Sequence, residues 1–265
     1  MSYLRDKLTI CVITHATKTE TRGQYAGFEN KVPSAPSSKL IEYVLNDLFN
    51  KTDLPNDIEI IVGLDNRIDR AVDIEYGQNL EKLKERYPGL RVKYNNSTSH
   101  DPIVTATKNF VGAIGDVQTP YYLLWEHDWV FNRPVEMEPL VRSMEKHDTF
   151  YVRFNQHRNM VASNVCESVF VPSDKSDVPI LGVNHMGNNP YVCKTEVFNK
   201  WWKHLLYETP EQGGFVEGPI NIFYKFAIEK MGFSKAMEQW GIHVYGNHND
   251  EAYIKHLNGN AVNFR

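Results

Sequence analysis

The most informative segment of this chain reads Tyr121-Tyr122-Leu123-Leu124-Trp125-Glu126-His127-Asp128-Trp129. Its first five residues are aromatic or branched and lie between a proline and two acids, which predicts a buried β-strand over 121–125. Two carboxylates spaced i, i+2 at the exit of such a strand can converge on one divalent cation, and that cation can hold a diphosphate. An isolated Glu-x-Asp is more often the start of a solvated loop, so the interpretation depends on the neighbouring segments.

The residues before this segment alternate between two kinds of pattern. Runs of β-branched and apolar residues predict strands over 8–14, 58–64 and 90–94. Helical spacing predicts helices over about 40–48, 76–87 and 102–116. A polar stretch from His15 to about Ser38 is rich in Gly and Pro and is typical of a binding loop. This alternation predicts right-handed crossovers and a mainly parallel central sheet flanked by helices, an α/β fold.

The second half of the chain does not show the regular alternation of strands and helices seen in the first half. Strands are predicted over 150–154, 169–171, 191–193 and 241–245, and helices over 197–206 and 220–231. The first of these strands alternates like a half-exposed one. A Gly- and Asn-rich stretch, Leu181 to Pro190, is either a plain turn or a loop that binds sugar hydroxyls. No repeat, low-complexity run or linker divides the chain.

Composition excludes several classes of protein. The 265 residues suffice for a substantial core, and 42% apolar with 23% charged residues is ordinary for a soluble globular protein. The net charge of −4 argues against a broad nucleic-acid-binding surface. Three distant cysteines without a Cys-x-x-Cys pair argue against a disulfide framework and a structural zinc site. With no signal-peptide core and no apolar run of about 20 residues, we expect a soluble, cytoplasmic enzyme without a membrane span.

Four landmarks stand in order along the chain: a strand ending in Thr14, a strand ending in Asp65, the helix of Lys108-Asn109 that leads into Glu126-His127-Asp128, and Glu217 at the start of a later helix. This order resembles the nucleotide-sugar-dependent glycosyltransferases of the GT-A fold, most closely the inverting family-2 type, over about residues 10–231. The resemblance implies a Rossmann-like single domain over 1–265. Residues 1–130 would bind the nucleotide-sugar and residues 131–265 the acceptor.

The resemblance also assigns roles to single residues. Asp65 would read the nucleobase or ribose, and Thr14 with His15 would lie beside the nucleotide. Lys108 would face the diphosphate, and Asp128 would be the main metal ligand. The chain departs from the family at the second strand, which ends without the usual paired acids.

A second departure is the first acid of the metal motif, which is Glu126 rather than Asp. Its longer side chain would reach the ribose or a metal-bound water. For the third metal ligand, the resemblance favours His248 in the loop after the late strand, with His243, His256 and His185 as rivals. Imidazole suits manganese-like ions, although a lone loop histidine is more often a surface residue.

Glu217 is the candidate catalytic base. Glycosyl transfer needs a group that removes the proton of the acceptor hydroxyl, and a carboxylate on the far side of the sugar can do this. The alternative is a helix-start carboxylate that is favoured only by the helix dipole. The family usually has an acidic pair here, whereas Gly218 follows in this chain, so Glu217 would act alone.

The expected function is metal-dependent transfer of a hexosyl or pentosyl group from a UDP- or GDP-sugar to a hydroxyl of a glycan or glycosylated acceptor, with inversion. The cofactors would be Mn²⁺ or Mg²⁺ and the nucleotide-sugar, and nucleic acid is not an expected partner. Two alternatives stay open: a non-catalytic nucleotide- or carbohydrate-binding module, and a metal-dependent phosphoesterase or nucleotidyltransferase. The latter usually needs more clustered acids than this segment offers.

Overall fold

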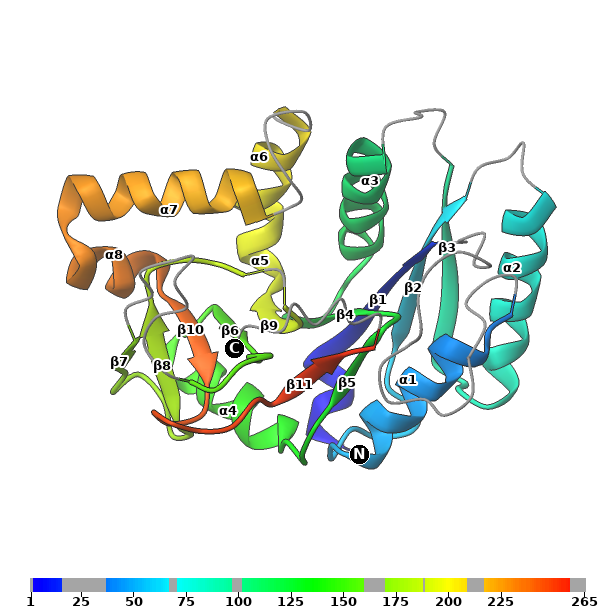
Figure 1. Ribbon diagram of the computed structural model, residues 1–265, viewed down its shortest axis with the longest axis horizontal. Coiled ribbons are helices and arrows are strands. Elements are labelled where there is room, and N and C mark those ends of the chain that lie inside the picture. The colour runs from blue at the N-terminus through cyan, green and yellow to red at the C-terminus, as the bar shows by residue number, and fades with distance from the viewer. Residues whose placement is uncertain are drawn as a thin grey trace.

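A computed structural model describes residues 2–15, 37–66, 71–96, 102–159, 170–187, 189–208 and 217–257. Within these residues nine strands form one sheet in the order β3-β2-β1-β4-β9-β6-β10-β8-β7, and two further strands form a small second sheet (Figure 1). The large sheet contains β1 (Leu8–His15), β2 (Ile60–Asn66), β3 (Leu90–Asn96), β4 (Tyr121–Glu126), β6 (Tyr151–Arg153), β7 (Phe170–Pro172), β8 (Ile180–Val183), β9 (Tyr191–Lys194) and β10 (Ile242–Tyr245). The small sheet pairs β5 (Trp129–Phe131) with β11 (Ile254–His256).

The helices surround the large sheet. They are α1 (Lys39–Asn50), α2 (Ala71–Lys82), α3 (Pro102–Gly115), α4 (Met137–His147), α5 (Thr195–Val197), α6 (Lys203–Glu208), α7 (Glu217–Met231) and α8 (Phe233–Trp240). Short 3₁₀ turns, η1 (Tyr3–Asp6) and η2 (Leu83–Glu85), precede β1 and follow α2, and a π-helical turn, η3 (Phe198–Trp202), joins α5 to α6.

Most strands of the large sheet run in one direction. β1 is parallel to β2 and β4, β2 is parallel to β3, and β6 is parallel to β10. β9 lies antiparallel between β4 and β6, and β8 lies antiparallel between β10 and β7. Only β9 and β8 therefore run against the others among the described strands. The prediction of an α/β fold with a mainly parallel sheet is confirmed.

The direction of chain travel reverses at β1. From β1 the chain moves outward to β2 and β3, and then returns through α3 to β4 on the other side of β1. Such a reversal leaves a crevice at the carboxyl ends of the strands, where open α/β sheets bind their ligands. His15 lies opposite Asp65 in the strand register, and Ile13 lies opposite Glu126. The ends of β1, β2 and β4 therefore meet at this edge.

The sheet is covered on both faces, because alternate side chains of each strand point in opposite directions. In β1, the side chains of Leu8, Ile10 and Val12 belong to a core that includes residues of α1, α2 and α4. Cys11 and Ile13 belong to a second core that includes residues of α3, α6, α7 and α8. Figure 1 shows α3, α6 and α7 on one side of the sheet and α1 and α4 on the other. This double burial explains the nearly continuous apolar sequence of the strand.

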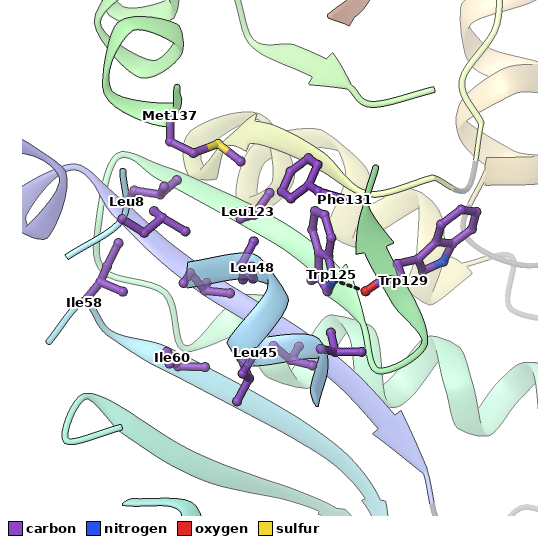
Figure 2. Close-up of a cluster of buried hydrophobic side chains, with 14 of the residues drawn as sticks. Leu8, Leu45, Leu48, Ile58, Ile60, Leu123, Trp125, Trp129, Phe131 and Met137 are labelled. Atoms are coloured by element: carbon purple, nitrogen blue, oxygen red, sulfur yellow. Dashed lines mark hydrogen bonds between the residues drawn. The ribbon is translucent and has the colours of Figure 1, made fainter. Parts of the chain in front are cut away.

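Trp125, a side chain of the first of these cores, holds the turn after β4. Figure 2 shows Trp125 and Phe131 side by side next to Leu123, and the two rings have centroids 4.7 Å apart. The indole Nε1 of Trp125 donates a hydrogen bond of 2.9 Å to the backbone oxygen of Trp129. Because Trp125 is fully buried, this bond holds the acidic turn 126–128 in one conformation.

Several elements differ from the sequence-based expectation. The strand predicted over 150–154 is present as β6, but the predicted half-exposure is wrong. β6 lies inside the sheet and all its residues are buried. The helix expected over 76–87 begins earlier, at Ala71. The helices α4 and α8 and the strands β5, β8 and β11 were not predicted. Most of the polar loop that follows His15 lies outside the described residues, and so does Cys166. Within the part of the chain described, no helix has the length and apolarity needed to cross a membrane.

Gly63 lies where α3 crosses β2, and its substitution tests this packing. A Cβ atom there would lie 2.8 Å from Ala113 Cβ and 2.8 Å from Asn109 Oδ1. We expect Gly63→Ala to lower the free energy of unfolding by about 1–3 kcal/mol, the usual range for overpacking. Gly115→Ala at the end of the same helix is the control, because nothing lies within 4 Å of its added Cβ. Urea unfolding curves measure both, and equal midpoints would contradict this packing.

Candidate active site

Asn109 ties together the carboxyl ends of β1 and β2. Its Nδ2 donates hydrogen bonds of 3.0 Å to the backbone oxygens of Thr14 and Gly63, and its side chain is buried. Its Oδ1 accepts a hydrogen bond of 2.7 Å from Asn95 on β3. Asn109 is therefore a structural residue. The sequence analysis assigned a role only to its neighbour Lys108.

The predicted nucleotide-binding residues lie along this edge. The Thr14 side chain is buried, and its hydroxyl is 2.7 Å from that of Tyr76. The backbone of His15 pairs with Asp65, which is half-buried at the end of β2. Lys108 is exposed on α3, one residue before Asn109. These four predicted residues are therefore gathered near one edge of the sheet, with Lys108 on the solvent side.

The acidic turn after β4 contacts the C-terminal strand. Asp128 is only 5% exposed, and its Oδ2 is 3.0 Å from Nε2 of His256. The pairing of β5 with β11 sets His256 opposite Trp129, with ring centroids 4.6 Å apart. The backbone N–H of Leu257 also donates a 2.7 Å hydrogen bond to the backbone carbonyl oxygen of Asp128. A histidine that is remote in sequence thus becomes the neighbour of the predicted metal ligand.

The other candidate histidines lie elsewhere. His248 is exposed in the loop after β10, where its ring faces Phe170 at a centroid distance of 6.4 Å. His243 is buried within β10, and His185 lies in the loop after β8. The assignment of His248 as a metal ligand stays a prediction. His256, named from sequence only as a rival, is the one that contacts Asp128.

Two side chains near the acidic turn could serve as ligands of a divalent cation. No group of three or more His, Cys, Asp or Glu side chains that could hold a metal occurs among the described residues. Asp128 and His256 nevertheless offer one carboxylate and one imidazole side by side. Ions such as Mg²⁺ are held by one or two protein ligands when substrate phosphates and water complete the shell. The residues present therefore fit a metal that binds together with a diphosphate.

Glu217 opens α7, as expected from the sequence, and its carboxyl group is partly buried. Its Oε2 is buried without a hydrogen-bond partner among the described residues. Burial raises the pKa of Glu217 to about 7, although the nearby guanidinium of Arg153 lowers it. A carboxyl group with this pKa changes its protonation state near neutral pH, as a general base requires.

The carboxyl group of Glu126 interacts electrostatically with those of Asp128 and Glu217. Burial is the main cause that raises the pKa of Glu126 to about 8, and repulsion from Asp128 and Glu217 adds to it, while the Trp129 side chain opposes it. Glu217 is therefore within electrostatic range of Glu126, although it is far away in the sequence. That Glu217 faces Asp128 across one cleft stays a prediction.

Arg153 is a buried charged residue near the candidate site that sequence reasoning missed. It ends β6, is only 4% exposed, and acts electrostatically on both Glu217 and His185. Burial together with this charge lowers the pKa of His185 to about 4. An Arg in an otherwise apolar strand was the available signal, because arginine is almost never fully buried unless it is paired.

Comparisons with known proteins support the fold. No protein-family model matches the sequence, and no curated protein matches it. The chain is similar to the crystal structure of S. aureus TarS 1–349, with 18% identity, a TM-score of 0.53, and coverage of 94% of this chain and 59% of that chain. The same TarS fragment in complex with UDP matches with 15% identity, a TM-score of 0.50 and the same coverage. The chain has the GT-A fold. It spans about three fifths of the length of these two solved TarS chains.

The raised pKa of Glu217 has a consequence for stability. Because this pKa lies above its ordinary value of 4.5, the native state holds the proton longer than the unfolded state between about pH 4.5 and 7. The wild type therefore loses stability relative to Glu217→Gln as pH rises through this window. We expect the Tm of Glu217→Gln to exceed that of the wild type by an increasing margin from pH 5 to pH 8.

The matched control is Glu196→Gln on α5. The exposed Glu196 has its pKa lowered by the hydrogen bond and charge of Lys200, so its replacement gives a pH dependence of opposite sign. Thermal unfolding at several pH values measures both differences. If the margin for Glu217→Gln stays constant with pH, Glu217 is not in the buried environment described above.

Proposed function

We propose that this chain is a glycosyltransferase that moves a sugar from a nucleotide-diphosphate donor to an acceptor hydroxyl. The observation that carries the proposal is the electrostatic interaction of Glu217 with Glu126, which ends β4 at the edge where the sheet reverses direction. The GT-A fold and the likeness to TarS, which has been solved with UDP, support this choice. Residues 1–130 form the donor-binding half and 131–265 the acceptor-binding half.

The donor half would bind the nucleotide at the ends of β1 and β2. Asp65 accepts hydrogen bonds from the nucleobase or ribose, beside the backbone of Thr14 and His15. The exposed ammonium of Lys108 offsets part of the diphosphate charge, and Glu126 contacts the ribose or a metal-bound water. The donor would be a UDP- or GDP-sugar.

Asp128 and His256 would hold a divalent ion such as Mn²⁺ or Mg²⁺, with His248 as the alternative histidine. When bound, this ion would neutralise the negative charge that builds up on the leaving diphosphate. Asp128 is suited to this position because its carboxylate is held by the rigid turn and faces the imidazole at 3.0 Å.

Glu217 would accept the proton of the acceptor hydroxyl. As the hydroxyl oxygen forms its bond to the anomeric carbon, the bond from that carbon to the diphosphate oxygen breaks. The proton goes to Glu217 and the electron pair leaves with the nucleoside diphosphate. Direct attack with a single base inverts the anomeric centre, by the geometric reasoning that distinguishes inverting from retaining glycosidases.

The decisive variant is Glu217→Gln. It keeps the shape of the side chain but cannot accept the proton, so we expect transfer to fall by about 10²- to 10⁴-fold. Donor binding should be unchanged. A thermal-shift screen of nucleotide-sugars with and without Mn²⁺ first identifies the donor, because ligand binding raises stability by mass action. Release of nucleoside diphosphate then measures turnover.

Glu196→Gln, on the exposed surface of α5, is the control for that experiment. Full turnover in Glu217→Gln would reject the base assignment. If the wild type binds a nucleotide-sugar but never releases nucleoside diphosphate with any acceptor, the chain is a binding module.

The metal site is tested with single histidine variants. We expect His256→Ala to weaken Mn²⁺-dependent UDP binding by at least about tenfold, since loss of even an outer-shell partner costs 10- to 100-fold. His204→Ala, an exposed histidine on α6, is the control. Calorimetric titration of UDP with Mn²⁺ measures the affinities. If His248→Ala weakens binding and His256→Ala does not, the metal ligand is His248.

A further inference from the structure

The guanidinium of Arg153 lies in a space that is open only because residue 187 is glycine. It ends β6, where it pairs with Tyr191 of β9 on one side and Val244 of β10 on the other. Its guanidinium passes over Gly187, and a Cβ atom on that glycine would lie 2.0 Å from Nη1. Any larger residue at position 187 would therefore displace the guanidinium.

The loop that carries Gly187 is fastened to the helix of Glu217. The Oδ1 of Asn221 accepts a 2.6 Å hydrogen bond from the backbone N–H of Met186, and its Nδ2 donates a 2.8 Å bond to the Met186 oxygen. Asn221 lies four residues after Glu217 in α7, so the two side chains share one face of the helix. Arg153, the loop and the first turn of α7 thus form one connected unit.

The charges within this unit favour the ionised form of Glu217. Burial raises the pKa of Glu217 and the positive charge of Arg153 lowers it, and these are the causes of its shift. The other titratable groups that interact with Glu217 are Glu126 and Tyr151. The helices packed on α7 also carry charged or titratable side chains, namely Lys203 and His204 on α6 and Lys235 and Glu238 on α8. None of these four contributes to the shift of Glu217.

We propose that Arg153 is a positioning residue for Glu217, held in place by the loop of Gly187 that Asn221 binds, and that its positive charge favours the ionised form of the base. This inference rests on the proposed function for its catalytic meaning. The physical reason is that arginine stays protonated at all relevant pH values, so its buried charge is a permanent counterion for a carboxylate that would otherwise hold its proton.

The test is the pH dependence of kcat/KM for Arg153→Met, Arg153→Lys and Gly187→Ala, with Gly115→Ala as the matched glycine control. Loss of a neighbouring arginine raises the pKa of a carboxyl group by about one unit or more. For Arg153→Met we therefore expect the acid limb, the fall in kcat/KM as the base takes up a proton, to move up by about one pH unit. At pH 6.5, with each enzyme scaled to its own alkaline plateau, kcat/KM should be about eightfold lower than in the wild type. Gly187→Ala should move the limb in the same direction, and Arg153→Lys should restore the wild-type limb.

A second readout does not depend on turnover. NMR of ¹³C-labelled glutamate carboxyls, with Glu217→Gln to assign the signal, follows the titration of Glu217 directly. We expect its midpoint to rise in Arg153→Met and in Gly187→Ala. If Arg153→Met does not fold, Gly187→Ala carries the test alone.

Two results overturn the inference: a uniform loss of activity at every pH with an unmoved acid limb, or a Glu217 titration that is the same in Gly187→Ala and the wild type. Failure of the proposed function looks different. In that case the wild type releases no nucleoside diphosphate at all, while the NMR titration still reports whether Arg153 acts on Glu217.

Discussion

Repulsion between the buried carboxyl group of Glu126 and two neighbouring acids is the constraint on which this structure depends. Asp128 follows in the same turn and Glu217 comes from a distant part of the chain, and both raise the cost of ionising Glu126. Gathering such groups does not add stability, because burying carboxyl groups beside one another weakens the native state. The arrangement makes sense when a ligand supplies the missing positive charge on one side and a proton to be removed on the other. This is the balance between stability and function that active sites commonly show.

The surrounding scaffold holds these acids with interactions that span the whole chain. Asn109 fastens the ends of β1 and β2, and the Trp125 indole fixes the turn that follows β4. The pairing of β5 with β11 brings His256 to Asp128. Arg153 reaches the cleft from the middle of the sheet, between β9 and β10. Each of these supports comes from a different element, so the geometry of the site is a property of the complete fold.

Sequence reasoning recovered the first half of the fold and singled out the acids at the end of β4, because local signals suffice there. Doubly covered parallel strands such as 8–14 are nearly continuous in apolarity, and their acids mark the carboxyl ends. The second half of the fold was predicted less well. The antiparallel insertion of β9 and the pairing of His256 with Trp129 depend on contacts between remote segments. Helix α4 was missed although Met137, Leu140, Val141 and Met144 follow helical spacing. Arg153 could not be assigned a role, because its burial becomes evident only when β6 is placed between two other strands.

A crystal structure of the protein with Mn²⁺ and UDP tests most directly whether the remote acids serve one reaction. The nucleotide should lie across the ends of β1 and β2, with its diphosphate and the ion beside Asp128. The Glu217 carboxylate should face the open side of the diphosphate, where an acceptor would enter. UDP bound away from this edge, or Glu217 turned to bulk solvent with no space shared with Asp128, would contradict the assignment.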